Sequence, residues 1–209
     1  MRKTQGFYRA LCSLAVVFFT ALSLAGCQTG QLDVAATYSA EAGFCYPPVT
    51  WGMSIEETEK AIGQKFGDAY AGSEEEGVDY RGSTPYDHAL FQTSPPETVT
   101  WEGMTGDVSY QFKNGELWAV SLLFDLFESP KAETELDGLV SALDKAYGKD
   151  AVTTSEAETD IHDASTAWQR QWSASHENGS RTTATLSAVI TDGEIGSVSL
   201  SFSRFPGGA

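Results

Sequence analysis

The stretch SVSLSFS at residues 197–203 alternates small polar and apolar side chains over its whole length. Successive side chains of a β-strand point to opposite faces of the sheet, so this pattern predicts a strand that buries Val198, Leu200 and Phe202. A strand that buries one face and exposes serines on the other is typical of an antiparallel sheet. The end of the chain is therefore expected to form a sheet with one packed and one polar face.

The residues before this stretch continue the same pattern. Residues 182–190 alternate in the same way and are joined to the last strand by the turn sequence at 191–196. Residues 166–172 predict a further strand, and the Asn-Gly pair in 176–181 is a strong hairpin signal. The last third of the chain is thus expected to form three consecutive antiparallel strands.

A second group of three strands is expected in the middle of the chain. Residues 98–103 and 107–112 alternate with period two, and a second Asn-Gly pair lies in 113–116. Residues 117–127 are apolar on both faces, which predicts a central strand covered on both sides.

Two helices are expected, one before each group of strands. Residues 51–67 have apolar side chains at helical spacing, and Ser54 with Glu57 forms a capping box. A second helix is expected to begin at Ser129, with Pro130 in its first turn, and to end at Gly148.

These elements predict an α+β fold of two layers, built from two αβββ units with the helices packed on antiparallel sheet. One domain is expected over 44–209, with halves at 44–127 and 128–209. The acidic segment 149–163 reads as a loop. Residues 68–96 read as a long loop that contains at most one short strand.

The beginning of the chain has the features of a bacterial export signal. Three basic residues and no acidic ones precede an apolar run at 11–24, which is too short for a confident membrane-spanning helix. The run ends in Leu24-Ala25-Gly26-Cys27, which resembles the lipobox of bacterial lipoproteins. The alternative is an ordinary secretory leader with a chance cysteine.

The resemblance implies that residues 1–26 are removed and that Cys27 becomes the mature N-terminus and carries a thioether-linked diacylglycerol, with acyl chains such as palmitate. Two acyl chains give stable anchoring. Residues 27–43 are then expected to be a lipidated N-terminus and polar tether. The protein would sit on the extracytoplasmic face of a cell membrane or outer membrane.

The net charge is strongly negative. The chain has 13 Lys and Arg residues against 29 Asp and Glu residues, a formal charge of −16, and loss of the three basic leader residues makes it −19. Such a surface repels polyanions, so a nucleic-acid partner is not expected. Cys12 is in the leader and Cys27 takes the lipid, which leaves Cys45 without an intrachain disulfide partner.

A catalytic site is not apparent in the sequence. The chain has no nucleotide-binding glycine loop, no Gly-x-Ser-x-Gly and no Cys-x-x-Cys. Asp160, His162 and Asp163 lie close together, as do the acids of 72–77, but neither group has the ligand set of a metal site. No metal and no cofactor are expected.

The candidate ligand site is aromatic. Trp168, Arg170 and Trp172 share one face of the strand at 166–172 and could stack on a sugar or peptide. The alternative is that these large side chains form the core beneath a helix.

Residues 49–63 (VTWGMSIEETEKAIG) resemble the opening of the SmpA/OmlA, or BamE-like, family of small outer-membrane lipoproteins. The shared pattern is Gly-Met-Ser followed by a short helix with an acidic start. The fold of the β-lactamase inhibitor protein uses similar helix-and-sheet units.

The sequence therefore predicts a membrane-anchored, non-enzymatic lipoprotein that binds an envelope protein or another envelope component. Two alternatives stay open: a small-ligand or glycan-binding domain that uses the tryptophan face, and a hydrolase with an unrecognised site.

Overall fold

The computed structural model describes residues 30–66, 70–71, 88–91, 97–126, 129–148, 153–162 and 165–207. Its elements are β1 (Gly30–Gln31), the 3-10 helix η1 (Val34–Thr37), β2 (Tyr38–Ser39), β3 (Gly43–Phe44), α1 (Ile55–Ile62), β4 (Tyr70–Ala71), β5 (His88–Phe91), β6 (Thr98–Trp101), β7 (Met104–Lys113), β8 (Glu116–Asp125), α2 (Ala132–Tyr147), β9 (Thr153–His162), β10 (Ser165–Ser175), β11 (Arg181–Thr191) and β12 (Glu194–Phe205).

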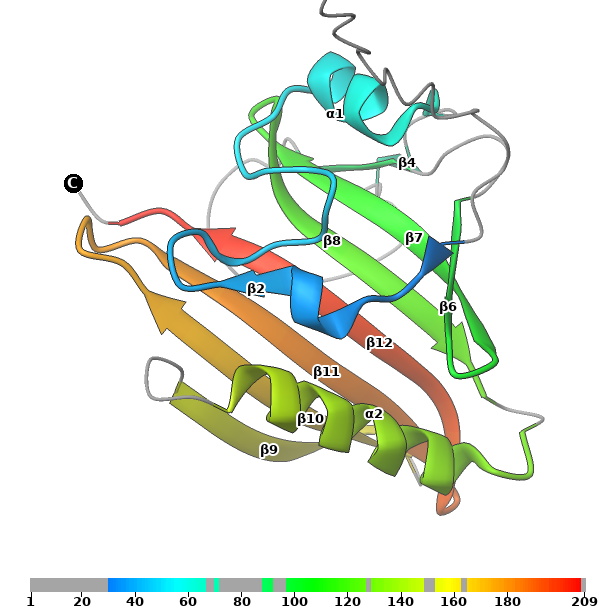
Figure 1. Cartoon of the computed structure of the whole chain (residues 1–209). Helices are drawn as coiled ribbons and strands as arrows, with labels where there is room; N and C mark the ends of the chain where they lie inside the picture. Colours follow the sequence, from blue (N-terminus) through cyan, green and yellow to red (C-terminus); the bar gives the residue numbers. More distant parts are fainter. Residues whose placement is uncertain are drawn as a thin grey trace, which may run out of the picture.

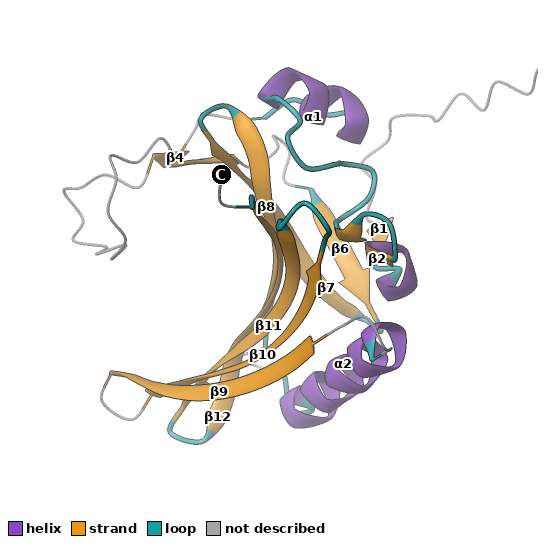
Figure 2. Ribbon diagram, turned by 90° about the vertical axis from the view of Figure 1, so that its left-hand side faces the viewer, coloured by secondary structure: helices purple, strands orange, loops and turns teal. Residues whose placement is uncertain are grey.

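Most of these strands belong to one curved sheet. Its order is β1-β6-β7-β8-β12-β11-β10-β9, with β5 paired to β7 and β4 paired to β5, while β2 and β3 form a separate pair. The β1–β6 pairing is parallel and the β12–β8 pairing is antiparallel, so the sheet is mixed. Figures 1 and 2 show the sheet curving around an open side, with α2 and β2 on its convex side.

The expected α+β fold class is wrong. The described chain is mostly strand, because β7 to β12 apart from α2 are ten to twelve residues long, and it has two α-helices of eight and sixteen residues. Only α2 lies along the sheet, while α1 lies near one end of β8 (Figure 1), so the helices do not form a layer of their own. The αβββ repeat fails as well, because four strands follow α2.

The missed fourth strand is β9, which lies in the segment that was expected to be a loop. It pairs with β10 along nearly its whole length and has no other partner strand. Its sequence, TTSEAETDIH, is polar on both faces. Edge strands tolerate charge because one side of their backbone faces solvent, so the usual apolar alternation is weak there.

The N-terminal segment completes the layer on the convex side of the sheet. Residues 30–43 were expected to belong to a tether, but β1 pairs with β6, and Leu32, Val34 and Thr37 are buried. The next residue, Phe44, is fully buried, and β3 packs across β10 and β11. Residues 30–43 therefore belong to the fold, because apolar side chains spaced along this polar segment cover sheet that α2 leaves open.

The helix boundaries follow their caps. The capping box of α1 is confirmed: Ser54 Oγ accepts from the Glu57 amide, and the Ser54 amide donates to the Glu57 carboxylate. The helix ends at Gly63, whose φ of 73° is left-handed. In α2, Ser129 lies outside the helix and the N-cap is Lys131, while Gly148 ends the helix as expected.

The core lies between the sheet and this layer. Val198, Leu200 and Phe202 of β12 are buried, as the alternation predicts. The opposite sheet face carries hydroxyls and amides, with Ser121 and Ser201 hydrogen-bonded across β8 and β12. Of the described helices, neither has the length and apolar composition needed to cross a membrane.

Candidate functional site

The predicted tryptophan face lies beneath α2. Trp168, Arg170 and Trp172 do share one face of β10, but Trp172 is fully buried and its ring meets that of Tyr147 edge to face. Trp168 is half-buried and packs against the same core. The three side chains are brought together, on the packed side of the sheet.

Asp144 of α2 holds two of these side chains. Its carboxylate accepts from Nε and Nη2 of Arg170 at 3.1 and 2.9 Å, and from Nε1 of Trp172 at 3.1 Å. Because the Asp144 carboxylate binds both the Arg170 guanidinium and the Trp172 indole, these contacts fix the position of α2 over the sheet. The guanidinium also lies 5.7 Å from the Trp172 ring. This geometry assigns the face a structural role.

Several sequence candidates cannot be placed. The lipidation residue Cys27, the acidic stretch 72–77 and Asp163 lie outside the described residues, and the side chains of Asp160 and His162 are not described. Within the part of the chain that is described, no group of three or more His, Cys, Asp or Glu residues could hold a metal ion.

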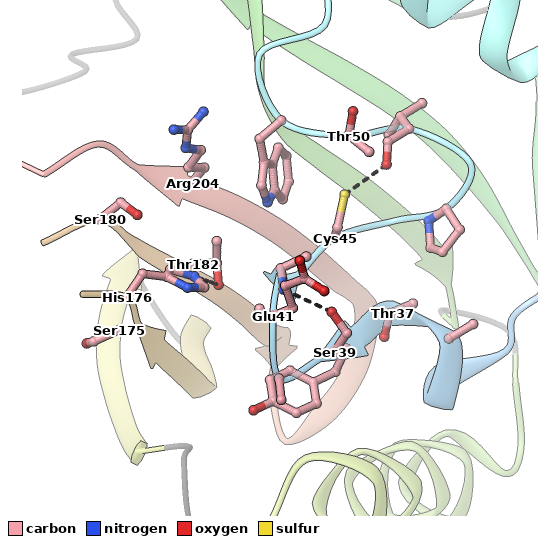
Figure 3. Close-up of a pocket in the computed structure, with 18 of the residues that line it drawn as sticks. Thr37, Ser39, Glu41, Cys45, Thr50, Ser175, His176, Ser180, Thr182 and Arg204 are labelled. Carbon is pink, nitrogen blue, oxygen red and sulfur yellow. Dashed lines mark hydrogen bonds between the residues drawn. The ribbon is translucent and has the colours of Figure 1, made fainter. Parts of the chain in front are cut away.

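A large cavity lies where the N-terminal segment crosses the ends of β10, β11 and β12. It has a volume of about 980 Å³ and was not foreseen from the sequence. Figure 3 shows its two walls: Arg204, Ser180, Thr182 and His176 come from the sheet, and Ser39, Glu41, Cys45 and Thr50 come from the N-terminal segment.

A hydrogen bond ties the two walls together at Phe44, whose amide donates to Thr182 Oγ1 at 3.0 Å. Within the N-terminal segment, the Phe44 carbonyl accepts from Trp51 Nε1 at 2.8 Å. Gly43 makes this approach possible. Its φ is +70°, and a Cβ there would lie 2.0 Å from Thr182 Oγ1. The cavity wall is therefore a fixed part of the fold.

The sheet wall carries one arginine. Arg204 lies near the end of β12, opposite Thr182 on β11, and is half-buried. His176 follows β10, and its Nε2 lies 3.5 Å from Thr182 Oγ1. That hydroxyl also accepts the Phe44 amide proton, so it contacts both His176 and the N-terminal segment.

The thiol in the cavity is unsuited to nucleophilic chemistry. Cys45 donates to the Val49 carbonyl at 2.9 Å. Burial raises the pKa of the thiol to about 11, so it stays protonated at neutral pH. A cysteine nucleophile needs a lowered pKa. The Cys45 thiol is therefore not poised to act as a nucleophile.

A smaller cavity of about 180 Å³ adjoins the first and shares Ala36, Thr37, Pro47 and Pro48 with it. Glu97 lines it and accepts from the Tyr110 hydroxyl at 2.7 Å. Burial raises the pKa of this carboxyl group.

Sequence reasoning missed the cavity because its walls are far apart in the chain. Two features of the sequence hint at the cavity. Arg204 occupies a core-facing position in the alternation of the last strand, where an apolar residue is expected. Gly43-Phe44 places a large apolar side chain within a polar segment. No protein-family model matches this chain, and no curated protein matches it.

Proposed function

We propose that this protein is a lipid-anchored, non-enzymatic binding protein on the extracytoplasmic face of a bacterial membrane, and that the cavity between the N-terminal segment and the sheet is its binding site. The observation that carries the proposal is the position of the lipobox cysteine: Cys27 comes three residues before Gly30, where the sheet begins.

The short distance to the lipid favours a fixed placement at the membrane. Three residues span about 10 Å when fully extended. Of the tether expected over 27–43, residues 30–43 belong to the fold, which leaves residues 27–29. The domain would therefore be held close to the lipid surface. Since β1 continues into η1 and β2, the described part of the chain between the lipid and the cavity is short and structured from Gly30 onward.

The lining of the cavity favours binding. Cavities of this volume match the usual range for small-molecule sites. Arg204 and His176 supply polar groups that can orient a ligand, and Trp51 supplies an aromatic surface. The protonated Cys45 thiol is a poor nucleophile.

The three cysteines of the chain allow a matched test of anchoring. Full-length protein is expressed in bacteria with labelled palmitate, and membrane and soluble fractions are compared by mass spectrometry. Cys27→Ser should remove the lipid mass and move the protein to the soluble fraction, while Cys45→Ser should leave both unchanged. A Cys27→Ser protein that is still lipidated and membrane-bound contradicts the anchoring.

Binding at the cavity can be tested in the intact envelope. A photo-crosslinking residue is placed at Ser39, on the rim of the cavity, and in a matched variant at Glu194, in the distant turn that starts β12. A reproducible adduct is expected from position 39 and not from position 194. Equal adducts at both positions, or none at 39, argue against a binding role for the cavity.

A further inference from the structure

Arg204 differs from the other two arginines of the described chain. Arg170 is paired with Asp144, and the Arg181 guanidinium lies 4.8 Å from the centre of the Phe205 ring. Among the described residues, Arg204 makes no ion pair and its guanidinium donates no hydrogen bond, although the chain has 29 acidic residues. A cation left without a carboxylate in such an acidic protein is available to a ligand.

The position of Arg204 suits this role. A Cβ on Gly52 would lie 3.7 Å from its Nη1, so the guanidinium lies near the N-terminal segment, and Arg204 lines the cavity. Its planar fork matches a carboxylate with two parallel hydrogen bonds. His176 lines the same cavity and adds a second nitrogen-bearing side chain.

The remaining charges of the cavity exclude a polyanion. Glu41 and Glu177 are exposed and also line it. In a chain of net charge −16, a ligand with several negative charges is repelled. The same two carboxylates favour a ligand that carries one positive charge in addition to its carboxylate, and the aromatic ring of Trp51 also attracts a cation.

We propose that the cavity binds a zwitterion, a free amino acid or a short peptide, with its carboxylate on Arg204 and its ammonium group toward Glu41 and Glu177. This inference rests on the proposed binding role of the cavity and names the class of ligand. The volume of about 980 Å³ is ample for a molecule of two or three amino acids.

The test is equilibrium dialysis of the full-length protein, purified in detergent, against defined mixtures. One mixture contains the free amino acids and a pool of tripeptides with free termini. A second contains the same tripeptides with amidated C-termini, and a third contains them with acetylated N-termini. Retained molecules are identified by mass spectrometry, and their dissociation constants are measured by titration.

Retention of one or more molecules from the first mixture is expected. Amidation should weaken binding at least about tenfold, because it removes the partner of a charge-assisted bidentate contact. Acetylation should weaken binding by a smaller factor, since Glu41 and Glu177 are exposed.

Variants of the two arginines provide the matched control. Arg204→Gln should weaken binding at least about tenfold, and Arg204→Lys should give a smaller loss because it keeps the charge but not the fork. Arg181→Gln, which changes a neighbouring arginine outside the cavity, should leave binding unchanged. Melting curves of each variant show whether it is folded.

The inference is overturned if no zwitterion is retained, if amidated peptides bind as tightly as free ones, or if Arg181→Gln and Arg204→Gln weaken binding equally. The peptide comparison uses the unaltered protein, so it decides the question even if Arg204→Gln does not fold. Membrane anchoring and crosslinking from position 39 are scored separately, so a cavity that crosslinks in the envelope but retains no zwitterion refutes only the ligand class.

Discussion

Replacement of Gly43 by alanine should destabilise the protein far more than a loop substitution normally does. The backbone at Gly43 is left-handed, with φ of +70°, and a Cβ would lie 2.0 Å from Thr182 Oγ1 and 2.9 Å from His176 Nε2. Real atoms do not approach so closely, so the alanine must separate the N-terminal segment from β11.

The cost has two parts. A left-handed conformation costs an alanine about 1 kcal/mol. Separation from Thr182 breaks the hydrogen bond from the Phe44 amide, and a buried donor left without an acceptor costs about 1–3 kcal/mol. Gly43→Ala should therefore lower the free energy of unfolding by about 3 kcal/mol.

Urea denaturation measures this cost, and Gly63→Ala is the matched control. Gly63 has nearly the same φ, +73°, but a Cβ there meets no atom within 4 Å. Its substitution should cost only the backbone part, about 1 kcal/mol. If Gly43→Ala lowers the free energy of unfolding no more than Gly63→Ala does, the two cavity walls do not pack as closely as described.

A double mutant separates the steric cost from the backbone cost. Thr182→Ala removes the hydroxyl that the new Cβ would meet, but also the acceptor of the Phe44 amide. Because both single changes break the same hydrogen bond, the double mutant should be less destabilised than the sum of the two. Additive losses would contradict the shared contact.

Three further predictions concern titratable groups. Asp144→Ala should lower the free energy of unfolding by about 1–2 kcal/mol, since it leaves Arg170 and the Trp172 indole without their acceptor, and the pair is only half-buried; urea denaturation at pH 7 measures it. In a variant with Cys45 as its sole cysteine, alkylation by iodoacetamide should stay slow in the folded protein until the pH approaches 11, and should become ordinary in urea; rapid alkylation of the folded protein at pH 8 would exclude the buried thiol. Because burial raises the pKa of Glu97, the folded state holds this proton to a higher pH than the unfolded chain, so the free energy of unfolding should fall as the pH rises from about 4.5 through the raised pKa. Glu97→Gln should flatten that fall, and an unchanged pH profile would show that the carboxyl is not buried in solution.

The strands could be predicted where one face is buried and the other is polar. The turns between them could be predicted as well. Asn114-Gly115 has positive φ at both residues, as the two-residue hairpin that its sequence favours requires, and Asn178-Gly179 forms the turn between β10 and β11 with positive φ at Gly179 alone. The edge strand β9 could not, because solvent on its free side removes the apolar alternation.

The N-terminal segment shows a different limit. Its few apolar residues, such as Leu32 and Phe44, have no periodicity, since η1, β2 and β3 each span two to four residues. Only the shape of the sheet surface decides that they are buried. Residues 27–43 were therefore interpreted as a tether, and the predicted fold contained only the two αβββ units over 44–209.

The site could not be predicted correctly because it too depends on contacts between residues far apart in the chain. The alternation placed Trp168, Arg170 and Trp172 on one face correctly, but could not show that Asp144 of α2 meets two of them. The cavity depends on pairs such as Phe44 and Thr182, which lie 138 residues apart. No local pattern records contacts over such a distance.

That separation also governs the order of folding. The wall formed by residues 36–51 is synthesised early, yet its partners on β11 and β12 are among the last residues of the chain. Contacts between distant residues form slowly because a long loop must close first. The N-terminal segment can therefore dock only after β10 and β11 have been made, and any chain that ends before β12 lacks Arg204 in the site. A completed cavity is thus a marker of a chain synthesised at least as far as β12.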